Sequence, residues 1–138
     1  MFSNILVAVD GSESSKRAFE KSLYLSQKCD CKLHVIHVVA CDLGGDSAIT
    51  FDLLEEIKAK AGSMLEGYKN EAGKNGISVN VMMHQGDPAQ IIIELSKKNG
   101  YDLIIMGTRG RTAFQELLLG SVSLKVIHHA SCPVMVVQ

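Results

Sequence analysis

The chain has 138 residues, of which 46% are hydrophobic and 21% charged, and its formal net charge is −1. This length predicts one domain over residues 1–138 that buries a core without disulfide or metal, and the charge balance argues against nucleic acid as a partner. The sequence shows no secretion signal and no run of the roughly 18 apolar residues that a membrane span needs, so we expect no membrane association and a cytoplasmic location.

Five segments are predicted as strands. Asn4–Val9 and Asp102–Met106 are continuous apolar runs, and Lys32–Val39 is rich in β-branched residues. Ser78–Met83 carries a weaker pattern, and Pro133–Val137 closes the chain. Apolar runs without clean alternation are typical of strands that are buried on both faces of a parallel sheet.

Helices are predicted between these strands. Ser12 can cap a helix over Glu13–Lys28, and the stretch Asp52–Gly73 is the clearest helix because its apolar residues recur three or four positions apart. A third helix begins at Asp87-Pro88, where the aspartate caps and the proline fits the first turn. A fourth begins near Gly120-Ser121.

The alternation of strands and helices predicts an α/β fold, an open sheet with helices packed against it. The one long connection, Ala40–Thr50, is polar and glycine-rich and is predicted as a loop. Open α/β sheets bind ligands at the carboxyl ends of their strands. We therefore look for functional residues at those ends.

The strongest local pattern is MGTRGRTAFQELLLGSVS, in which Gly107, Gly110 and Gly120-Ser121 are spaced as G-x2-G-x9-G-S. Gly107 ends a buried strand, where a missing Cβ lets a ligand approach the backbone. Gly120-Ser121 opens a helix, whose free N–H groups and dipole favour phosphate. The alternative is that these glycines only make turns and that Ser121 caps the helix.

Three charged residues near these strand ends have two interpretations each, whereas one histidine and three methionines are expected to lie in the core. Asp10 ends the first strand, so its carboxylate can accept hydrogen bonds from ribose hydroxyls, or it can only shape a turn before the next helix. Arg109 and Arg111 can pair with phosphates or stay solvated. His37 is expected to be a satisfied core histidine, and the three methionines of the predicted strands are expected to fill the core: Met82, Met83 and Met106.

Several enzyme patterns are absent from the sequence. It has no G-x-x-x-x-G-K-[ST] loop, no G-x-G-x-x-G after the first strand and no G-x-S-x-G elbow. A phosphoacceptor receiver domain needs an acidic pair after the first strand, and only Asp10 stands there. No general base can be assigned, so catalysis is uncertain and a weak ATPase activity is the most that we expect.

These residues together resemble the universal stress protein family over essentially the whole chain. The matching segments are ILVAVDGS, HVV, GDPAQIIIELSKKNGYDLIIMGTRGRT and LLLGSVSLKVIHHASCPVMVV. The resemblance implies a Rossmann-like sheet of five parallel strands in the order 3-2-1-4-5, with helices on both faces. That order would place Asp10 and Gly107 beside one crevice.

The ATP-binding members of this family keep the glycine pattern found here, so the resemblance also implies a site. Asp10 would contact ribose, Val38 would offer backbone hydrogen bonds to adenine, and Mg²⁺ or Mn²⁺ would sit mainly on the phosphates. Some ATP-binding relatives carry Pro-Thr where this chain has Ala8-Val9, which affects the shape of the adenine pocket. The nucleotide-binding residues implied are Ala8, Val9, Asp10, Val38, Met106, Gly107, Gly110, Gly120, Ser121, Val122 and Ser123.

The function implied is that of an ATP-binding stress or signalling protein with slow or no hydrolysis. Two alternatives stay open, namely an interaction module that does not bind nucleotide and a weak ATPase. Members of the family typically form homodimers through the last strand. The apolar segment Val134–Val137 is expected to do so here, because an exposed strand edge invites pairing.

Overall fold

The computed structural model describes residues 2–40, 50–108 and 119–138. Strands and helices alternate along the chain, as the sequence predicted. Within these ranges the elements are β1 (Asn4–Ala8), α1 (Glu13–Cys29), β2 (Lys32–Val39), α2 (Phe51–Lys74), β3 (Val79–Gln85), α3 (Pro88–Lys98), β4 (Leu103–Gly107), α4 (Ser121–His129) and β5 (Val134–Val137).

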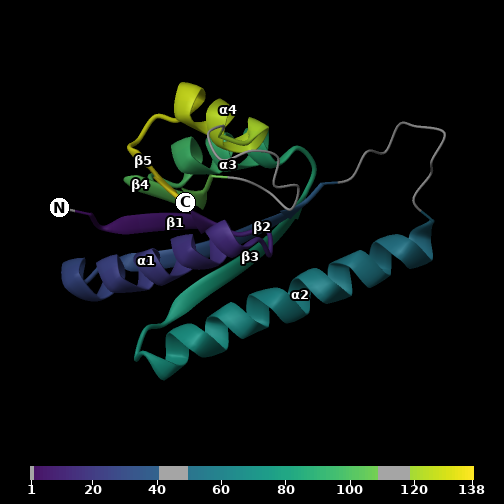
Figure 1. Cartoon of the computed structure of the whole chain (residues 1–138), viewed down its shortest axis with the longest axis horizontal. Coiled ribbons are helices and arrows are strands. Elements are labelled where there is room, and N and C mark those ends of the chain that lie inside the picture. Colours follow the sequence, from purple (N-terminus) through teal and green to yellow (C-terminus); the bar gives the residue numbers. More distant parts are fainter. Residues whose placement is uncertain (1, 41–49, 109–118) are drawn as a thin grey trace.

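The five strands form one parallel sheet in the order β3-β2-β1-β4-β5, which confirms the predicted topology. Helices α1 and α2 cover one face of the sheet and α3 and α4 cover the other (Figure 1). The strand order reverses between β1 and β4, so the carboxyl ends of these neighbouring strands open a crevice. None of the helices in the described ranges combines the length and apolar character required to cross a membrane.

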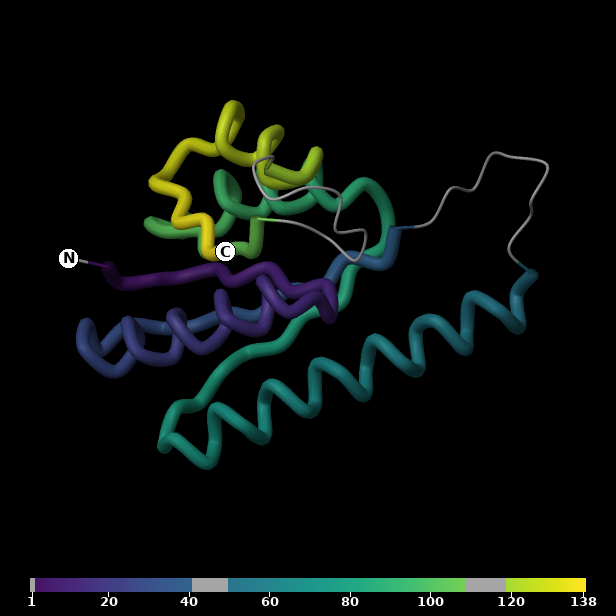
Figure 2. Tube along the Cα trace, in the orientation of Figure 1, coloured from purple at the N-terminus to yellow at the C-terminus, as the bar shows by residue number. Residues whose placement is uncertain are grey.

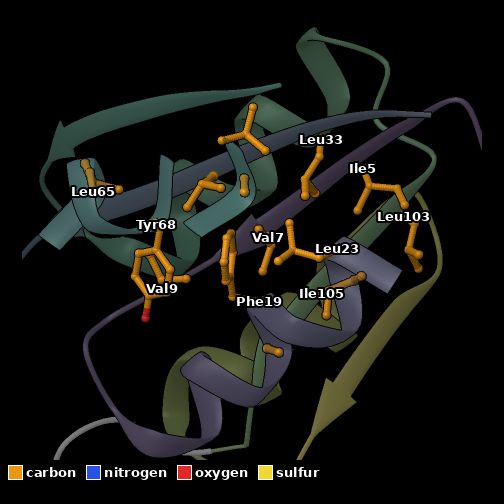
Figure 3. Close-up of a cluster of buried hydrophobic side chains, with 14 residues drawn as sticks. Ile5, Val7, Val9, Phe19, Leu23, Leu33, Leu65, Tyr68, Leu103 and Ile105 are labelled. Carbon is orange, nitrogen blue, oxygen red and sulfur yellow. The ribbon is translucent and has the colours of Figure 1, made fainter. Parts of the chain in front are cut away.

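The sheet separates two hydrophobic clusters. Phe19 of α1 and Tyr68 of α2 pack against the first face, with ring centroids 4.5 Å apart, and Figure 3 shows them beside Val9. Ile92 of α3 and Val126 of α4 pack against the second face. The central strands β1 and β4 contribute to both clusters, which is why their sequences are continuous apolar runs.

The edge strand β3 departs from the prediction in two ways. It runs on to Gln85, beyond the expected end at Met83, and Met83 is 38% exposed although it was expected to fill the core. The covering helix α2 extends past the strands at its amino-terminal end (Figure 2), where Phe51 is 76% exposed. Met83 lies on an edge strand, and its Cε faces Gly62 of α2, which has no side chain to cover it. The prediction for Met83 was therefore wrong, whereas Met106 is buried.

The helix starts distinguish α4 from the others. Ser12, Thr50 and Asp87 cap α1, α2 and α3 by accepting a backbone N–H through a side-chain oxygen. The cap of α4 is Gly120, which has no side chain to offer, and Ser121 is the first helical residue and not the cap. The first N–H groups of α4 therefore have no side-chain acceptor from the cap position.

Candidate functional site

A cavity of about 350 Å³ lies where β1, β2 and β4 end. Its walls come from both sides of the strand-order reversal and from the first turns of three helices. The lining residues are Ala8, Val9, Asp10, Ser15, Ile36, Val38, Ala40, Pro88, Ile92, Met106, Gly107, Leu119, Gly120, Ser121, Val122 and Ser123.

Ten of the eleven site residues expected from the sequence line this one cavity. They come from segments more than 100 residues apart in the chain, and the sheet order brings them together. The eleventh, Gly110, lies outside the described residues, as do Arg109, Arg111 and positions 41–49 of the predicted loop. The expected residues at the ends of β1 and β2 thus lie in the same cavity as those at the end of β4 and the start of α4.

The amino terminus of α4 forms the polar wall. Gly120 N–H donates to the carbonyl of Thr108 at 2.6 Å, which ties the start of α4 to the end of β4. The Ser123 hydroxyl donates to the carbonyls of Thr108 at 3.0 Å and of Gly120 at 3.2 Å. A hydroxyl has one hydrogen to donate, so Ser123 uses it on these carbonyls and braces the turn at the start of α4.

Gly107 has a packing role that the sequence did not indicate. A Cβ built at this position would stand 2.7 Å from the backbone nitrogen of Ser15 and 2.8 Å from the carbonyl carbon of Ser14. Both atoms belong to the first turn of α1. The absence of a side chain at Gly107 therefore lets α1 lie against β4, a role in addition to the ligand approach that the sequence predicts.

Asp10 shapes the turn between β1 and α1. Its Oδ1 accepts the N–H of Ser12 at 2.9 Å, and its own N–H donates to the hydroxyl of Ser15 at 3.3 Å. Burial raises the pKa of Tyr68 in the adjoining core, and the charge of Asp10 raises that pKa further, against a lowering hydrogen bond from Ser15. Asp10 thus shapes the turn, as one of its two expected roles requires, and among the residues that the structure describes no hydrogen bond reaches its Oδ2.

Six lining residues were not expected from the sequence: Ser15, Ile36, Ala40, Pro88, Ile92 and Leu119. Two of them had a usable signal. Ile36 lies two positions before Val38 on the same strand and so shares its face. Pro88 begins a helix that follows the carboxyl end of β3, at the sheet edge where ligands bind.

The chain matches the universal stress protein family over residues 1–138. The universal stress protein YxiE of Bacillus subtilis is 31% identical over 148 residues that cover both proteins completely. Among solved structures, the universal stress protein UspA of Lactobacillus plantarum superposes with a TM-score of 0.89 at 25% identity, covering 99% of this chain and 98% of that one. A universal stress protein family protein from Arabidopsis thaliana, solved with AMP bound, has a TM-score of 0.74 at 27% identity, covering 98% and 90%.

Proposed function

The chain belongs to the universal stress protein family, and from that premise we propose that it is an ATP-binding stress or signalling protein with slow or no hydrolysis. The observation that carries the proposal is the cavity, which gathers ten of the residues expected from the glycine pattern and its distant partners. The relative from Arabidopsis thaliana with AMP bound supports an adenine nucleotide as the ligand class.

The two sides of the cavity suit the two ends of a nucleotide. The first N–H groups of α4, at Ser121, Val122 and Ser123, have no capping side chain and would bind phosphate oxygens. On the other side, Ile36 and Met106 form an apolar wall for the base. Asp10 follows β1, which lies between the strands of these two residues, and its carboxylate would accept hydrogen bonds from the ribose hydroxyls. The arrangement orients the ligand with its phosphates toward α4.

A divalent cation fits this site only through the nucleotide. Asp10 is the one carboxylate among the described lining residues, and one of its oxygens already accepts the N–H of Ser12. Mg²⁺ and Mn²⁺ prefer several oxygen ligands. We propose that the phosphates would supply most of those ligands, and the cation would reduce the repulsion between them.

Holding is favoured over hydrolysis by the side chains around the cavity. Asp10 is also the one titratable group among the described lining residues, and its place in the turn aims one oxygen at the backbone. General base catalysis needs a proton acceptor positioned at the attacking water. A weak ATPase would need a proton acceptor from outside the described lining residues. An interaction module that does not bind nucleotide would not explain the uncapped N–H groups at the start of α4.

The direct experiment is mass spectrometry of the nucleotide released when the purified protein is precipitated with acid. We expect ATP, ADP or AMP, and we expect Mg-ATP to raise the unfolding temperature because a ligand that binds only the folded state stabilises it. Calorimetry with ATP, AMP and cyclic AMP completes the test. An absence of heat with all three would contradict the proposal and favour the interaction module, and steady turnover lost in Asp10→Ala would favour the ATPase.

We further propose that two copies pair through β5, which is an edge strand of the sheet. Thr108 N–H donates to the carbonyl of Val137, and Ile104 N–H donates to the carbonyl of Pro133. Pro133 and Val137 therefore direct their carbonyls toward β4. Because alternate residues of a strand point their backbone groups to opposite sides, the N–H of Val136 points to the open edge of the sheet, where a second strand could accept it.

Replacing Val136 with proline should separate the two copies. Val136→Pro removes an outward N–H and leaves the groups that face β4 in place, since proline is tolerated on strand edges. We expect sedimentation velocity to report a dimer for the parent and for Val136→Thr, which keeps the N–H, and a monomer for Val136→Pro. A Val136→Pro protein that still sediments as a dimer would place the interface elsewhere.

A further inference from the structure

The ladder between β1 and β2 ends beside the cavity. Its last residue pair is Ala8 with Ile36, and Val9 N–H donates to the carbonyl of Ile36 at 2.9 Å. On the other side of β2, the carbonyl of Val39 accepts the N–H of Gly86 after β3. Backbone groups alternate between the two neighbours of a strand. Val38 therefore directs its N–H and C=O past the end of β1, on the side of the cavity that it lines.

The next rung of this ladder would join the N–H of Val38 to the carbonyl of Val9. In the structure that carbonyl meets Nδ1 of His37 at 2.7 Å. A carbonyl oxygen only accepts hydrogen bonds, so Nδ1 carries the hydrogen. Within the described ranges the ladder register goes no further than Ala8. The imidazole thus holds the carbonyl of Val9, and within the described ranges no backbone hydrogen bond joins that carbonyl to the N–H of Val38.

We propose that His37 is a positioning residue for recognition of the base, and this proposal rests on the proposed function, nucleotide binding. By donating to the carbonyl of Val9, it keeps the N–H and C=O of Val38 available to the edge of an adenine. Adenine offers an acceptor at N1 and a donor at its 6-amino group, which match one N–H and one C=O. Hypoxanthine offers a donor and an acceptor in the reverse order, so it leaves both backbone groups unpaired.

His37 performs this role without touching the ligand. It is not among the residues that line the cavity. Its neighbours two and four positions back, Val35 and Leu33, belong to the cluster under α1 and α2, and alternation places His37 on the same face. It acts across the strand, through the carbonyl of Val9, on the backbone of Val38.

The test uses two variants of one shape. In His37→Asn the side-chain amide nitrogen stands where Nδ1 stands, and His37→Leu puts a methyl group there. We expect the parent and His37→Asn to bind AMP more tightly than inosine monophosphate in calorimetry. In His37→Leu we expect AMP affinity to fall about tenfold, as for one hydrogen bond. Ribose 5-phosphate, which has no base, should bind all three proteins equally.

Amide hydrogen exchange of the ligand-free proteins gives an independent readout. We expect the Val38 amide to exchange quickly in the parent and in His37→Asn, and slowly in His37→Leu, where it closes onto the carbonyl of Val9. If His37→Leu does not fold, the same measurements are made on His37→Phe, whose side chain also lacks a hydrogen-bond donor.

Equal ratios of AMP to inosine monophosphate affinity in the parent and His37→Leu, or equal protection of the Val38 amide, would overturn the inference. A parent that binds none of these compounds would instead contradict the proposed function. The exchange comparison would then still decide whether His37 holds Val38 out of the ladder, so the two failures are distinguishable.

Discussion

Gly120→Val should abolish nucleotide binding while leaving the protein folded. Gly120 is the cap of α4, and the side chain of a cap residue lies over the first N–H groups of its helix. An isopropyl group there occupies the position of a phosphate oxygen and offers no acceptor. We expect AMP affinity to fall by at least about 100-fold, because several charge-assisted hydrogen bonds are lost together.

The backbone at Gly120 tolerates this substitution. Its φ of −63° and ψ of 161° lie in the extended region that any residue adopts, and the bond from Gly120 N–H to Thr108 does not involve a side chain. Calorimetry with AMP and adenosine measures the effect. Adenosine lacks the phosphate, so its weaker binding should persist in Gly120→Val, and circular dichroism confirms the fold.

The matched control is Gly67→Val on α2, where a Cβ would meet nothing within 4 Å. It introduces the same side chain on an outer surface and should leave AMP affinity at the parent value. If Gly120→Val bound AMP as the parent does, with its fold intact, the start of α4 would not be the phosphate site.

Much of this site could be predicted from sequence because its parts follow local rules. Asp87-Pro88 and Gly120-Ser121 predict helix starts, and the apolar runs of β1 and β4 predict central strands. Since the carboxyl ends of parallel strands meet at one edge of a sheet, these local predictions converge on one crevice once the strand order is known. The order itself came from the family resemblance.

The remaining features depend on contacts between segments that are distant in the chain. The exposure of Met83 depends on the edge position of β3 and on Gly62 as its neighbour in α2, which no pattern within either segment indicates. The role of His37 depends on the register of β1 against β2, because the register decides which carbonyl lies within reach of the ring. The need for glycine at Gly107 depends on the closeness of α1, and that distance is a property of the packed structure.

That closeness makes Gly107→Ala the substitution with the largest expected effect on stability. A methyl group at Gly107 would meet backbone atoms of Ser14 and Ser15 at 2.8 Å and 2.7 Å, and backbone in a helix cannot rotate away as a side chain would. Overpacking of this kind costs about 1–3 kcal/mol, which for a chain of this size lowers the unfolding temperature by roughly 3–12 °C.

Gly67→Ala gives a control with the opposite sign. Gly67 is an interior residue of α2 with open space where a Cβ would stand, and alanine in a helix is about 1 kcal/mol more favourable than glycine. Urea unfolding should therefore rank Gly67→Ala above the parent and Gly107→Ala below it. An unchanged free energy of unfolding in Gly107→Ala would mean that α1 does not lie this close to β4.

The clash in Gly107→Ala should also weaken nucleotide binding. The strain at Gly107 is relieved only if α1 moves away from β4, and α1 carries Ser15, whose hydroxyl accepts the N–H of Asp10. Asp10 would then shift relative to the start of α4 on the far side of the cavity. We expect Gly107→Ala to bind AMP more weakly at temperatures well below its unfolding transition, and Gly67→Ala to bind it as the parent does. A loss of stability without a loss of affinity would show that the ribose side of the site is positioned independently of α1.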